Sequence, residues 1–388
     1  MKIKVAILGS TGSIGKSTLE VIRRNKKNFD IIFLSANNNF KELIKQAKEF
    51  NVQNVQINNN FFLNKVNKSL KKYRTKVYGN NIALNKIIRQ KIDYSMASIV
   101  GIAGLQPTID IIKVSKVVAL ANKETIICAW DIISKTVKKY KTKIVPVDSE
   151  HFSIMELTKN AKDHEIKEII ITASGGPFLK LPIKKLKKVK PSEAIKHPNW
   201  SMGKKISVDS ANLMNKVFEV IEATKIFNFD KNKYKIVIHP QSYVHSIIRF
   251  KNGLTKMILY NSDMKIPISN ILYNSKDNSL NEKNININYL NKMNFHKVDR
   301  KKFPSIKFIK KCLNLGHSTP TIVNASNEVL VDLFLKQKIG FLDIANNINK
   351  IFKDKEFKKY AKKKPKSVKD IKIVDNWARL KTMSMCVL

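Results

Sequence analysis

Short apolar segments alternate with amphipathic segments through the first 147 residues, and no other feature of the sequence restricts the fold as strongly. Apolar runs predict strands at 3–8, 30–35, 53–57, 94–99, 116–120 and 143–147. Helical periodicity predicts helices at about 14–24, 40–49, 80–90, 104–113 and 124–139. Strands that alternate with helices form a parallel sheet covered on both faces. We therefore predict a Rossmann-like domain over residues 1–147, with ligands at the carboxyl ends of its strands.

The remaining sequence predicts two further domains, as expected for a chain of 388 residues. Over residues 148–273, a helix at 210–224 accompanies strands at 167–173, 235–239, 244–250 and 255–260, which indicates an α+β domain with an antiparallel sheet. Its loop at 174–205 is rich in Gly, Pro and Lys. A polar linker at 274–303 leads to a helical domain at 304–388. The predicted fold class is α/β.

The cysteine usage and hydropathy indicate a cytoplasmic protein. Only three cysteines occur, and they form no CxxC pair, which argues against a disulfide framework or a zinc site. The chain enters an apolar strand directly, without a secretion or transit pattern. No apolar run reaches the roughly 18 residues that a membrane helix needs, so we expect no membrane partner.

The formal net charge of +43 has two interpretations. It indicates either a nucleic-acid-binding protein, whose affinity would fall steeply with salt, or a general drift of composition toward Lys. Lysines occur in every segment, and no run interleaves them with aromatic residues that stack on bases. We favour drift and expect no nucleic-acid partner, although the charge should attract anionic substrates.

A glycine-rich turn, Gly9 to Gly15, follows the first strand and opens the first helix. Glycines allow a sharp turn, and the free N–H groups at a helix start bind phosphate. The alternative is a tight turn without a ligand. After the second strand, an NAD enzyme usually has an acidic residue, but here the sequence reads Ser35-Ala36-Asn37-Asn38-Asn39. A carboxylate there would repel a 2′-phosphate, so its absence favours NADP.

Carboxylates follow the last strand of the first domain, at Asp148 and Glu150. In an extended segment these two side chains point the same way, and two carboxylates on one face repel unless a cation joins them. Hard oxygen ligands without thiolates suit Mg²⁺ or Mn²⁺. The alternative is a helix N-terminus, capped by Asp148 or Ser149, with Glu150 in the first turn.

Three polar residues of the predicted helix at 210–224 share one region of its surface: Asn215, Lys216 and Glu219. Lys216 can hold a phosphate while Glu219 completes a three-carboxylate metal site. The alternative is an ordinary surface pair of Lys and Glu.

The loop at 174–205 carries further candidates for the site. Ser174 can donate to a phosphate, and Trp200 stands on a polar, glycine-flanked loop that resembles a lid. The alternatives are a core tryptophan and, for His197, a structural histidine.

Taken together, the motifs resemble the 1-deoxy-D-xylulose 5-phosphate reductoisomerase family. They are GSTGSIG at 9–15, ANKE at 121–124, PVDSEH at 146–151, SGGPF at 174–178, HPNWSMG at 197–203, KISVDSANLMNKVFE at 205–219, IHPQSYVHS at 238–246 and DMKIP at 263–267. The similarity extends from about residue 3 to residue 335. So many long motifs in one order disfavour the separate structural interpretations above.

The resemblance implies a reaction, its cofactors and an assembly. Members of this family convert 1-deoxy-D-xylulose 5-phosphate to 2-C-methyl-D-erythritol 4-phosphate in the non-mevalonate isoprenoid pathway, using NADPH and Mg²⁺, Mn²⁺ or Co²⁺. The implied chemistry is a retro-aldol cleavage, an aldol recombination and hydride transfer to the resulting aldehyde. The resemblance also implies a homodimer built from an N-terminal cofactor domain, a central catalytic domain and a C-terminal helical domain.

By motif position, the resemblance also implies the site residues. The metal ligands would be Asp148, Glu150 and Glu219, which with Lys123 form the catalytic set. The substrate, a small phosphorylated sugar, would contact Lys123, Ser149, Glu150, Ser174, His197, Trp200, Ser210, Asn215, Lys216 and Glu219. The cofactor would contact Thr11, Gly12, Ser13, Ile14, Asn37, Asn38, Asn39, Asn122, Glu124 and Gly203.

Two departures from the family pattern stand out. The family often has Gly-Lys-Asn in the adenosine loop where this chain has Asn37-Asn38-Asn39, and loss of the Lys weakens the expected contact with the 2′-phosphate. The last ten or so residues also differ from the usual tail.

Overall fold

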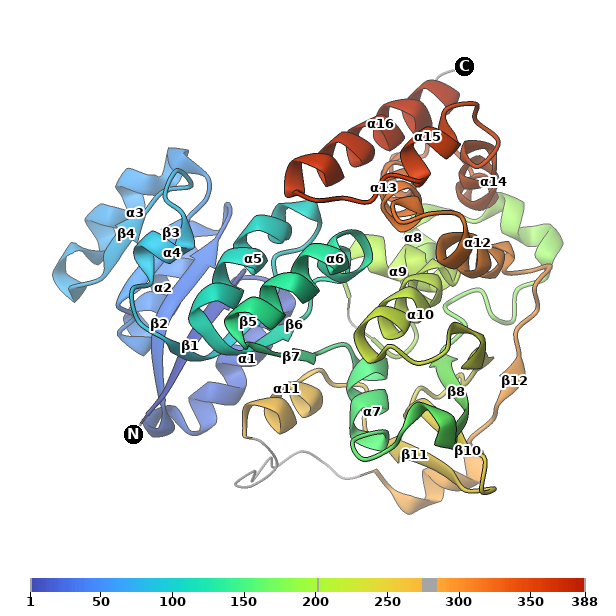
Figure 1. Cartoon of the computed structure of the whole chain (residues 1–388), viewed down its shortest axis with the longest axis horizontal. Helices are drawn as coiled ribbons and strands as arrows, with labels where there is room; N and C mark the ends of the chain where they lie inside the picture. The colour runs from blue at the N-terminus through green and yellow to red at the C-terminus, as the bar shows by residue number, and fades with distance from the viewer. Residues whose placement is uncertain (1, 201, 274–284, 387–388) are drawn as a thin grey trace. The chain divides into compact units, whose positions relative to one another are not determined.

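The computed structural model describes residues 2–200, 202–273 and 285–386 (Figure 1). These residues form two compact units, each made from separate stretches of the chain. Unit 1 contains the described residues of Met1–Thr125, Asp131–Phe152 and Met264–Glu282. Unit 2 contains the described residues of Ile126–Trp130, Ser153–Asp263 and Lys283–Leu388.

Unit 1 is built around a parallel sheet. Among the described residues it has seven strands in the order β4-β3-β2-β1-β5-β6-β7, and every neighbouring pair is parallel. The strands are β1 (Ile3–Leu8), β2 (Phe29–Ala36), β3 (Asn54–Ile57), β4 (Lys76–Tyr78), β5 (Ile92–Ala97), β6 (Ser115–Leu120) and β7 (Lys143–Pro146). The order reverses at β1, which lies between β2 and β5, and ligands of such sheets bind at this point of reversal.

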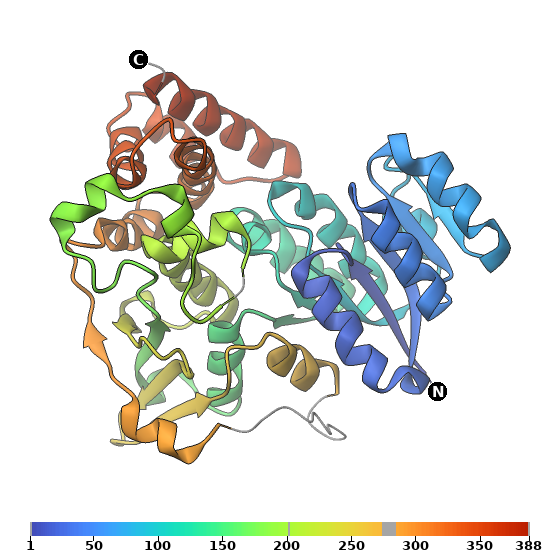
Figure 2. The ribbon, with the colours of Figure 1, turned by 180° about the vertical axis from the view of Figure 1, so that it is seen from behind.

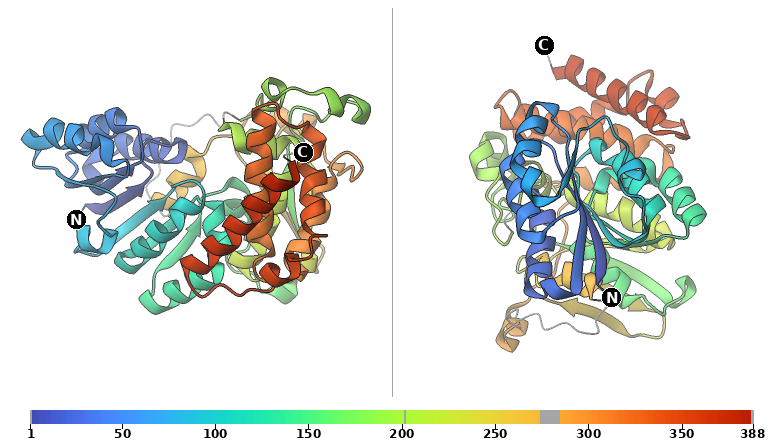
Figure 3. Two further views of the ribbon diagram at one scale, coloured as in Figure 1. Left: turned by 90° about the horizontal axis from the view of Figure 1, so that it is seen from above. Right: turned by 90° about the vertical axis from the view of Figure 1, so that its left-hand side faces the viewer.

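Helices lie on both faces of this sheet (Figure 3). They are α1 (Ser13–Arg24), α2 (Phe40–Phe50), α3 (Leu63–Leu70), α4 (Leu84–Ile87), α5 (Leu105–Val114), α6 (Lys123–Tyr140) and α11 (Lys265–Leu272), with 3-10 turns η1 (Lys26–Asn28), η2 (Asn60–Phe62), η3 (Lys71–Tyr73) and η4 (Ile102–Gly104). Because both faces are covered, the strands can be apolar throughout, and residues 5–8 of β1 are at most 1% exposed.

Helix α11 packs against the first helix of unit 1, although almost 240 residues separate them in the sequence (Figure 2). Lys265 Nζ lies 3.0 Å from Glu20 Oε1 of α1. Just after α11, the Tyr273 and Phe29 rings form a T-shaped contact with 5.4 Å between their centroids. The chain therefore returns to complete unit 1 after it has formed strands β8 to β11 of unit 2 and before it forms β12.

Unit 2 is built around a mixed sheet. Among the described residues its strands run in the order β11-β10-β8-β9-β12, with β8 and β9 parallel and the other pairs antiparallel. The strands are β8 (Ile166–Ala173), β9 (Tyr234–Ile238), β10 (Val244–Phe250), β11 (Thr255–Leu259) and β12 (His296–Lys297). The prediction of an antiparallel sheet is therefore wrong for β8 and β9. Their connection carries several helices and is long enough for a parallel crossover.

Some of the remaining helices lie around this sheet, and the others follow it toward the C-terminus. They are α7 (Ser149–Leu157), α8 (Pro191–Ala194), α9 (Lys204–Ala211), α10 (Met214–Phe227), α12 (Phe308–Asn314), α13 (Thr319–Leu335), α14 (Phe341–Ile351), α15 (Phe357–Ala361) and α16 (Val368–Cys386), with 3-10 turns η5 (Asp163–Glu165), η6 (Ile183–Lys188), η7 (Lys231–Lys233), η8 (Ile287–Lys292) and η9 (Pro304–Lys307). Within unit 2, buried residues of α10 pack on the sheet, and a separate apolar cluster joins α13 to α16. In the part of the chain that the structure describes, no helix is both long and apolar enough to cross a membrane.

The predicted fold class is confirmed: unit 1 is Rossmann-like, and unit 2 combines a sheet with a C-terminal group of helices. One predicted helix is largely wrong, because only Leu84–Ile87 of residues 80–90 is helical. The sequence predictions did not include α3 and β4. Helix α3 is short and rich in Asn and Lys, and β4 has only three residues, so neither produces an apolar run long enough to recognise.

Two other predictions need correction. The expected helix at 210–224 is two helices, α9 and α10, that meet at Leu213, whose φ of 59° breaks the helical path. The Asn212 side chain accepts from Met214 N at 2.9 Å and stabilises this break. In the expected linker, residues 274–284 lie outside the described residues, whereas His296–Lys297 forms a sheet strand.

The glycine turn of unit 1 depends on close backbone packing. A Cβ on Gly15 would lie 2.4 Å from the Gly9 carbonyl oxygen and 2.5 Å from Ser10 Cα. Gly15→Ala should therefore destabilise the protein by about 1–3 kcal/mol, as overpacking does, measured by urea unfolding without cofactor. Gly203→Ala is the control, because nothing lies within 4 Å of its added Cβ. Equal losses in the two variants would contradict this packing argument.

Candidate active site

The turn from β1 to α1 leaves the first amides of α1 without a capping side chain. Gly9 has a φ of 79°, and Gly12 is the N-cap residue of α1. Gly12 and Ser13 are exposed, and Thr11 and Ile14 are partly exposed. A turn of this kind can present backbone N–H groups to a phosphate.

The loop after β2 carries the three predicted asparagines, Asn37, Asn38 and Asn39, all of them exposed. Asn39 caps α2 by accepting from Glu42 N at 3.3 Å. Asn38 accepts from the Asn59 amide at 2.9 Å. The loop therefore holds its shape through amide contacts and contains no carboxylate that would repel a 2′-phosphate.

Asn122 holds together two loops at the carboxyl edge of the sheet. Its Oδ1 accepts from Thr125 N at 2.7 Å and caps α6, while its Nδ2 donates to the Gly101 carbonyl at 3.0 Å. The next acidic residue, Glu124, is buried in the first turn of α6. These contacts fix the backbone around Lys123.

Asp148 and Glu150 do not lie in an extended segment, so the alternation that predicted a shared direction is wrong. Helix α7 begins at Ser149, and Asp148 Oδ1 accepts from Glu150 N at 3.3 Å. This geometry matches the alternative prediction, in which Asp148 caps a helix and Glu150 lies in its first turn. Ser149 Oγ donates to Glu150 Oε2 at 2.5 Å, which orients the second carboxylate.

Lys123 Nζ forms an ion pair with Asp148 Oδ2 within unit 1. Burial acts to raise the pKa of the Asp148 carboxyl, but the positive charge of Lys123 and the hydrogen bonds around the carboxylate outweigh it. They hold the pKa of Asp148 well below its usual range, so this carboxyl is ionised at neutral pH.

Helix α10 presents Asn215, Lys216 and Glu219 together, as the sequence spacing predicts. The Asn215 amide donates to Glu219 Oε1, and Lys216 Nζ lies 2.7 Å from Glu219 Oε2. Lys216 and Glu219 are buried, with residue exposures of 6% and 1%. The alternative of a surface pair is therefore wrong.

The three predicted metal ligands are divided between the two units: Asp148 and Glu150 lie in unit 1, and Glu219 lies in unit 2. Glu150 and Glu219 are buried, and Asp148 is half-buried. A buried carboxylate is costly unless positive charge faces it, and oxygen donors of this kind suit a hard divalent cation.

His197 links two predicted substrate residues within unit 2. Its Nε2 lies 2.9 Å from Ser174 Oγ and 3.1 Å from Ser210 Oγ. Its Nδ1 accepts from the backbone N–H groups of Asn199 at 3.1 Å and Trp200 at 3.0 Å. Because Nδ1 is an acceptor, the neutral ring carries its proton on Nε2, facing the serines.

Two residues that the sequence analysis did not select contribute to the loop beside this histidine. The Asn199 amide donates to the Ser242 hydroxyl at 2.9 Å, which ties the loop to the turn between β9 and β10. The His245 ring lies 5.9 Å from the Trp200 ring, so Trp200 is partly covered rather than free. Asn199 lies in the motif HPNWSMG and His245 in the motif IHPQSYVHS. Both motifs contribute to the family resemblance, and they could have identified these two residues.

Three family models match most of the chain. Their descriptions are "1-deoxy-D-xylulose 5-phosphate reductoisomerase" for residues 5–130, the "1-deoxy-D-xylulose 5-phosphate reductoisomerase C-terminal domain" for residues 144–227 and the "DXP reductoisomerase C-terminal domain" for residues 259–381. A reductoisomerase from Pelagibacter ubique (strain HTCC1062) is 49% identical over 388 residues, covering 99% of this chain and 100% of that protein. The chain belongs to the 1-deoxy-D-xylulose 5-phosphate reductoisomerase family.

Other members of the reductoisomerase family agree in sequence and structure. A relative from Wolbachia pipientis wMel is 40% identical over 344 residues, which is 88% of each protein. The Zymomonas mobilis reductoisomerase in complex with NADPH has a TM-score of 0.92 and 34% identity, covering all of both chains. A reductoisomerase in complex with NADPH, fosmidomycin and magnesium has a TM-score of 0.92 and 31% identity, covering 99% of this chain and 98% of that chain.

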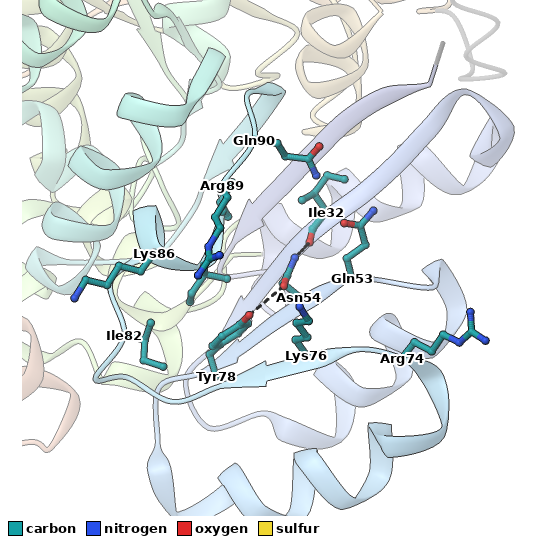
Figure 4. Close-up of a pocket in the computed structure, with 12 residues that line it drawn as sticks. Ile32, Gln53, Asn54, Arg74, Lys76, Tyr78, Ile82, Lys86, Arg89 and Gln90 are labelled. Atoms are coloured by element: carbon teal, nitrogen blue, oxygen red, sulfur yellow. Dashed lines mark hydrogen bonds between the residues drawn. The ribbon is translucent and has the colours of Figure 1, made fainter.

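Unit 1 of this reductoisomerase also contains a groove of about 730 Å³ (Figure 4). Asn54 lies in it, donating to the Ile32 carbonyl at 3.2 Å and accepting from the Tyr78 hydroxyl at 3.5 Å. The lining residues are Ile32, Gln53, Asn54, Arg74, Lys76, Tyr78, Ile82, Lys86, Ile87, Ile88, Arg89 and Gln90. None of them is a predicted site residue, so we do not assign the groove to the reaction.

The environment of His197 predicts its behaviour with pH. Burial, together with the charge of Lys216, lowers the pKa of His197 from its ordinary 6.5 to about 4. The unfolded chain therefore takes up this proton first as the pH falls, and the contribution of His197 to stability is lost between pH 6.5 and about 4. Nitrogen-detected NMR should show a neutral ring protonated on Nε2 at pH 6, with the signal assigned by its loss in His197→Gln. A titration midpoint near 6.5 would contradict the burial argument.

Proposed function

We propose that this chain converts 1-deoxy-D-xylulose 5-phosphate to 2-C-methyl-D-erythritol 4-phosphate, using NADPH and a divalent metal ion. It is therefore an NADP-dependent oxidoreductase that also performs isomerase chemistry in the non-mevalonate isoprenoid pathway. The observation that carries the proposal is the similarity of this chain to named reductoisomerases over its whole length, and the buried carboxylates Glu150 and Glu219 fit a metal-dependent reaction.

The solved relatives support the cofactors. One holds NADPH, another holds NADPH, fosmidomycin and magnesium, and a third holds magnesium. We infer that Asp148, Glu150 and Glu219 hold the ion in this chain, with Mn²⁺ and Co²⁺ as possible replacements for Mg²⁺. Bound metal supplies Lewis-acid polarisation of the sugar carbonyl, and bound NADPH supplies the hydride.

The residues of the chain bind and orient the substrate. We infer that Ser174, Ser210, Asn215 and Lys216 hold the phosphate, with His197 Nε2–H fixing the two serine hydroxyls. Lys216 is buried and therefore attracts an anion more strongly than a solvated lysine does. Lys123 neutralises oxyanion charge at the reacting end, while Ser149 orients Glu150. The Trp200 indole covers the substrate and excludes water.

Most of the predicted contacts with the cofactor lie in unit 1, and Gly203 belongs to unit 2. We infer that the first amides of α1, at Thr11, Gly12, Ser13 and Ile14, bind its pyrophosphate, and that Asn37, Asn38 and Asn39 lie near the adenosine. Asn122, Glu124 and Gly203 complete the predicted contacts. The absence of an acidic residue after β2 supports NADP over NAD.

The proposal also covers the oligomeric state, the cellular location and the domain boundaries of the protein. We infer a homodimer, which the exposed apolar side chains of unit 2 support: Leu254, Met257, Ile287, Tyr289 and Phe295 are each at least 40% exposed. The three free cysteines support a reducing cytoplasm. We infer functional domains at 1–147, 148–273 and 304–388, connected by residues 274–303, of which His296–Lys297 pairs with β9.

The central test is metal-dependent turnover, followed as NADPH loss with 1-deoxy-D-xylulose 5-phosphate. A chelator should abolish it, and added Mg²⁺ should restore it. Glu219→Gln should lower turnover and metal affinity at least about 10-fold, since even residues that only support a ligand contribute about 10–100-fold.

Glu156→Gln is the matched control, because Glu156 lies on α7 and pairs with Lys159 at 2.8 Å on the surface. It should keep wild-type turnover and metal affinity. Full activity of Glu219→Gln, or activity that survives the chelator, would overturn the proposal.

The cofactor loop provides an independent prediction. Asn37→Asp introduces a carboxylate beside the expected 2′-phosphate, so NADPH affinity should fall about tenfold, or about 1.4 kcal/mol, with NADH affinity unchanged. Fluorescence titration with both cofactors measures the change. Asn64→Asp adds the same charge at an exposed position of α3 and should leave NADPH affinity as it is. If both variants weaken NADPH binding equally, the loss comes from long-range charge and not from a contact between residue 37 and the 2′-phosphate.

A further inference from the structure

A buried hydrogen bond joins the C-terminal helices to the helix that carries Ser210. Asn327 lies on α13, and its Nδ2 donates to Asp209 Oδ1 on α9 at 2.7 Å. Asn327 is fully buried, and Asp209 is 2% exposed. The two residues are 118 positions apart in the sequence. A buried carboxylate needs hydrogen-bond donors in place of water. With α9 in this position, Asp209 Oδ1 therefore needs the donor that Asn327 provides.

Asp209 is held from two directions. Its Oδ1 accepts from Asn327, and its Oδ2 lies 3.0 Å from Lys205 Nζ, one turn earlier on α9. The lysine contact is internal to α9 and moves with it. The asparagine contact is external and fixes α9 relative to α13.

The residue after Asp209 belongs to the proposed phosphate site. Ser210 Oγ lies 3.1 Å from His197 Nε2, and Ser174 Oγ lies 2.9 Å from the same atom. The turn that carries Ser174 packs on the end of α9. A Cβ on Gly176 would lie 2.7 Å from Ala211 Cα and 3.0 Å from the Ser210 carbonyl oxygen. A small shift of α9 therefore changes the distance between the two serine hydroxyls.

The short junction after α9 couples the position of α10 to the position of α9. Only Asn212 and Leu213 separate the two helices, and Leu213 has a left-handed φ of 59°. Helix α10 then presents Asn215 and Lys216. The end of α9 thus sets where all the proposed phosphate-binding groups of residues 210–216 lie.

We propose that Asn327 is a positioning residue for phosphate recognition, acting through Asp209 on the register of α9. The inference rests on the proposed function and names a residue in the C-terminal helices that affects substrate affinity without touching substrate. It requires the amide N–H of Asn327, and not only its volume.

Asn327→Asp is the direct test, since it keeps the size of the side chain and replaces the donor by a carboxylate facing Asp209. The Michaelis constant for 1-deoxy-D-xylulose 5-phosphate should rise about tenfold, because α9 must then be repositioned when phosphate binds, and a buried hydrogen bond to a charged group contributes a free energy of that size. The inhibition constant of inorganic phosphate should rise in parallel. The turnover number should change less, and NADPH affinity should stay constant.

A reciprocal variant keeps the test independent of folding losses. In Asp209→Asn combined with Asn327→Asp, donor and acceptor exchange places, while the oxygen of the new amide still faces Lys205. Both constants should return to within about threefold of wild type, as expected for a coupled pair. A merely structural role would change the melting temperature of the variants but not the Michaelis constant of the folded enzyme.

Asn324→Asp is the matched control. Asn324 is buried on the same helix, one turn earlier, and its amide donates to Glu328 Oε1 at 3.1 Å within α13. This variant should lower stability without changing the Michaelis constant.

Wild-type enzyme in the same assay separates the two possible failures. Absence of wild-type turnover would overturn the proposed function. Wild-type turnover with an unchanged Michaelis constant in Asn327→Asp would overturn this inference alone, as would a reciprocal variant no better than the single one.

Discussion

Buried negative charge is the constraint on which the arrangement of the site depends. A carboxylate leaves water only where cations or hydrogen-bond donors replace its hydration. Lys123 faces Asp148, Lys216 faces Glu219, and the Ser149 hydroxyl serves Glu150. These lysines therefore differ from the many that raise the net charge, because each is paired with an acid, in a buried pair at Lys216 and Glu219 and in a partly buried pair at Lys123 and Asp148.

The same principle explains why Asp148 and Glu150 lie at the start of a helix. Glu150 stands in the first turn of α7, and Asp148 accepts from its backbone amide. Negative charge is stabilised at a helix N-terminus by the unpaired N–H groups there. Helix capping and metal binding, which compete as interpretations of the sequence, are thus compatible uses of one pair of carboxylates.

Much of the fold could be predicted because apolar strands in a parallel sheet are buried on both faces. β1, β2 and β6 are recognisable for this reason, whereas the edge strand β4 is three residues long and begins with Lys76. Spacing also predicted that Asn215, Lys216 and Glu219 share a helix face. It could not show the break at Leu213 or the Asn199 and Trp200 amides on His197, because those depend on backbone angles and loop contacts. The contact between Asn327 and Asp209 has no local signal at all.

The return of the chain to unit 1 at α11 has a consequence for how the protein is made. Helix α1 buries one face early, but its neighbour α11 begins only at Lys265. While the ribosome is still producing the sheet of unit 2, the first unit lacks this helix and exposes the surface that α11 will cover. A fragment that ends after β7 would lack α11 and would keep that surface exposed. Each unit is thus assembled from stretches of chain that are synthesised at different times, and neither can be isolated as one continuous piece of polypeptide.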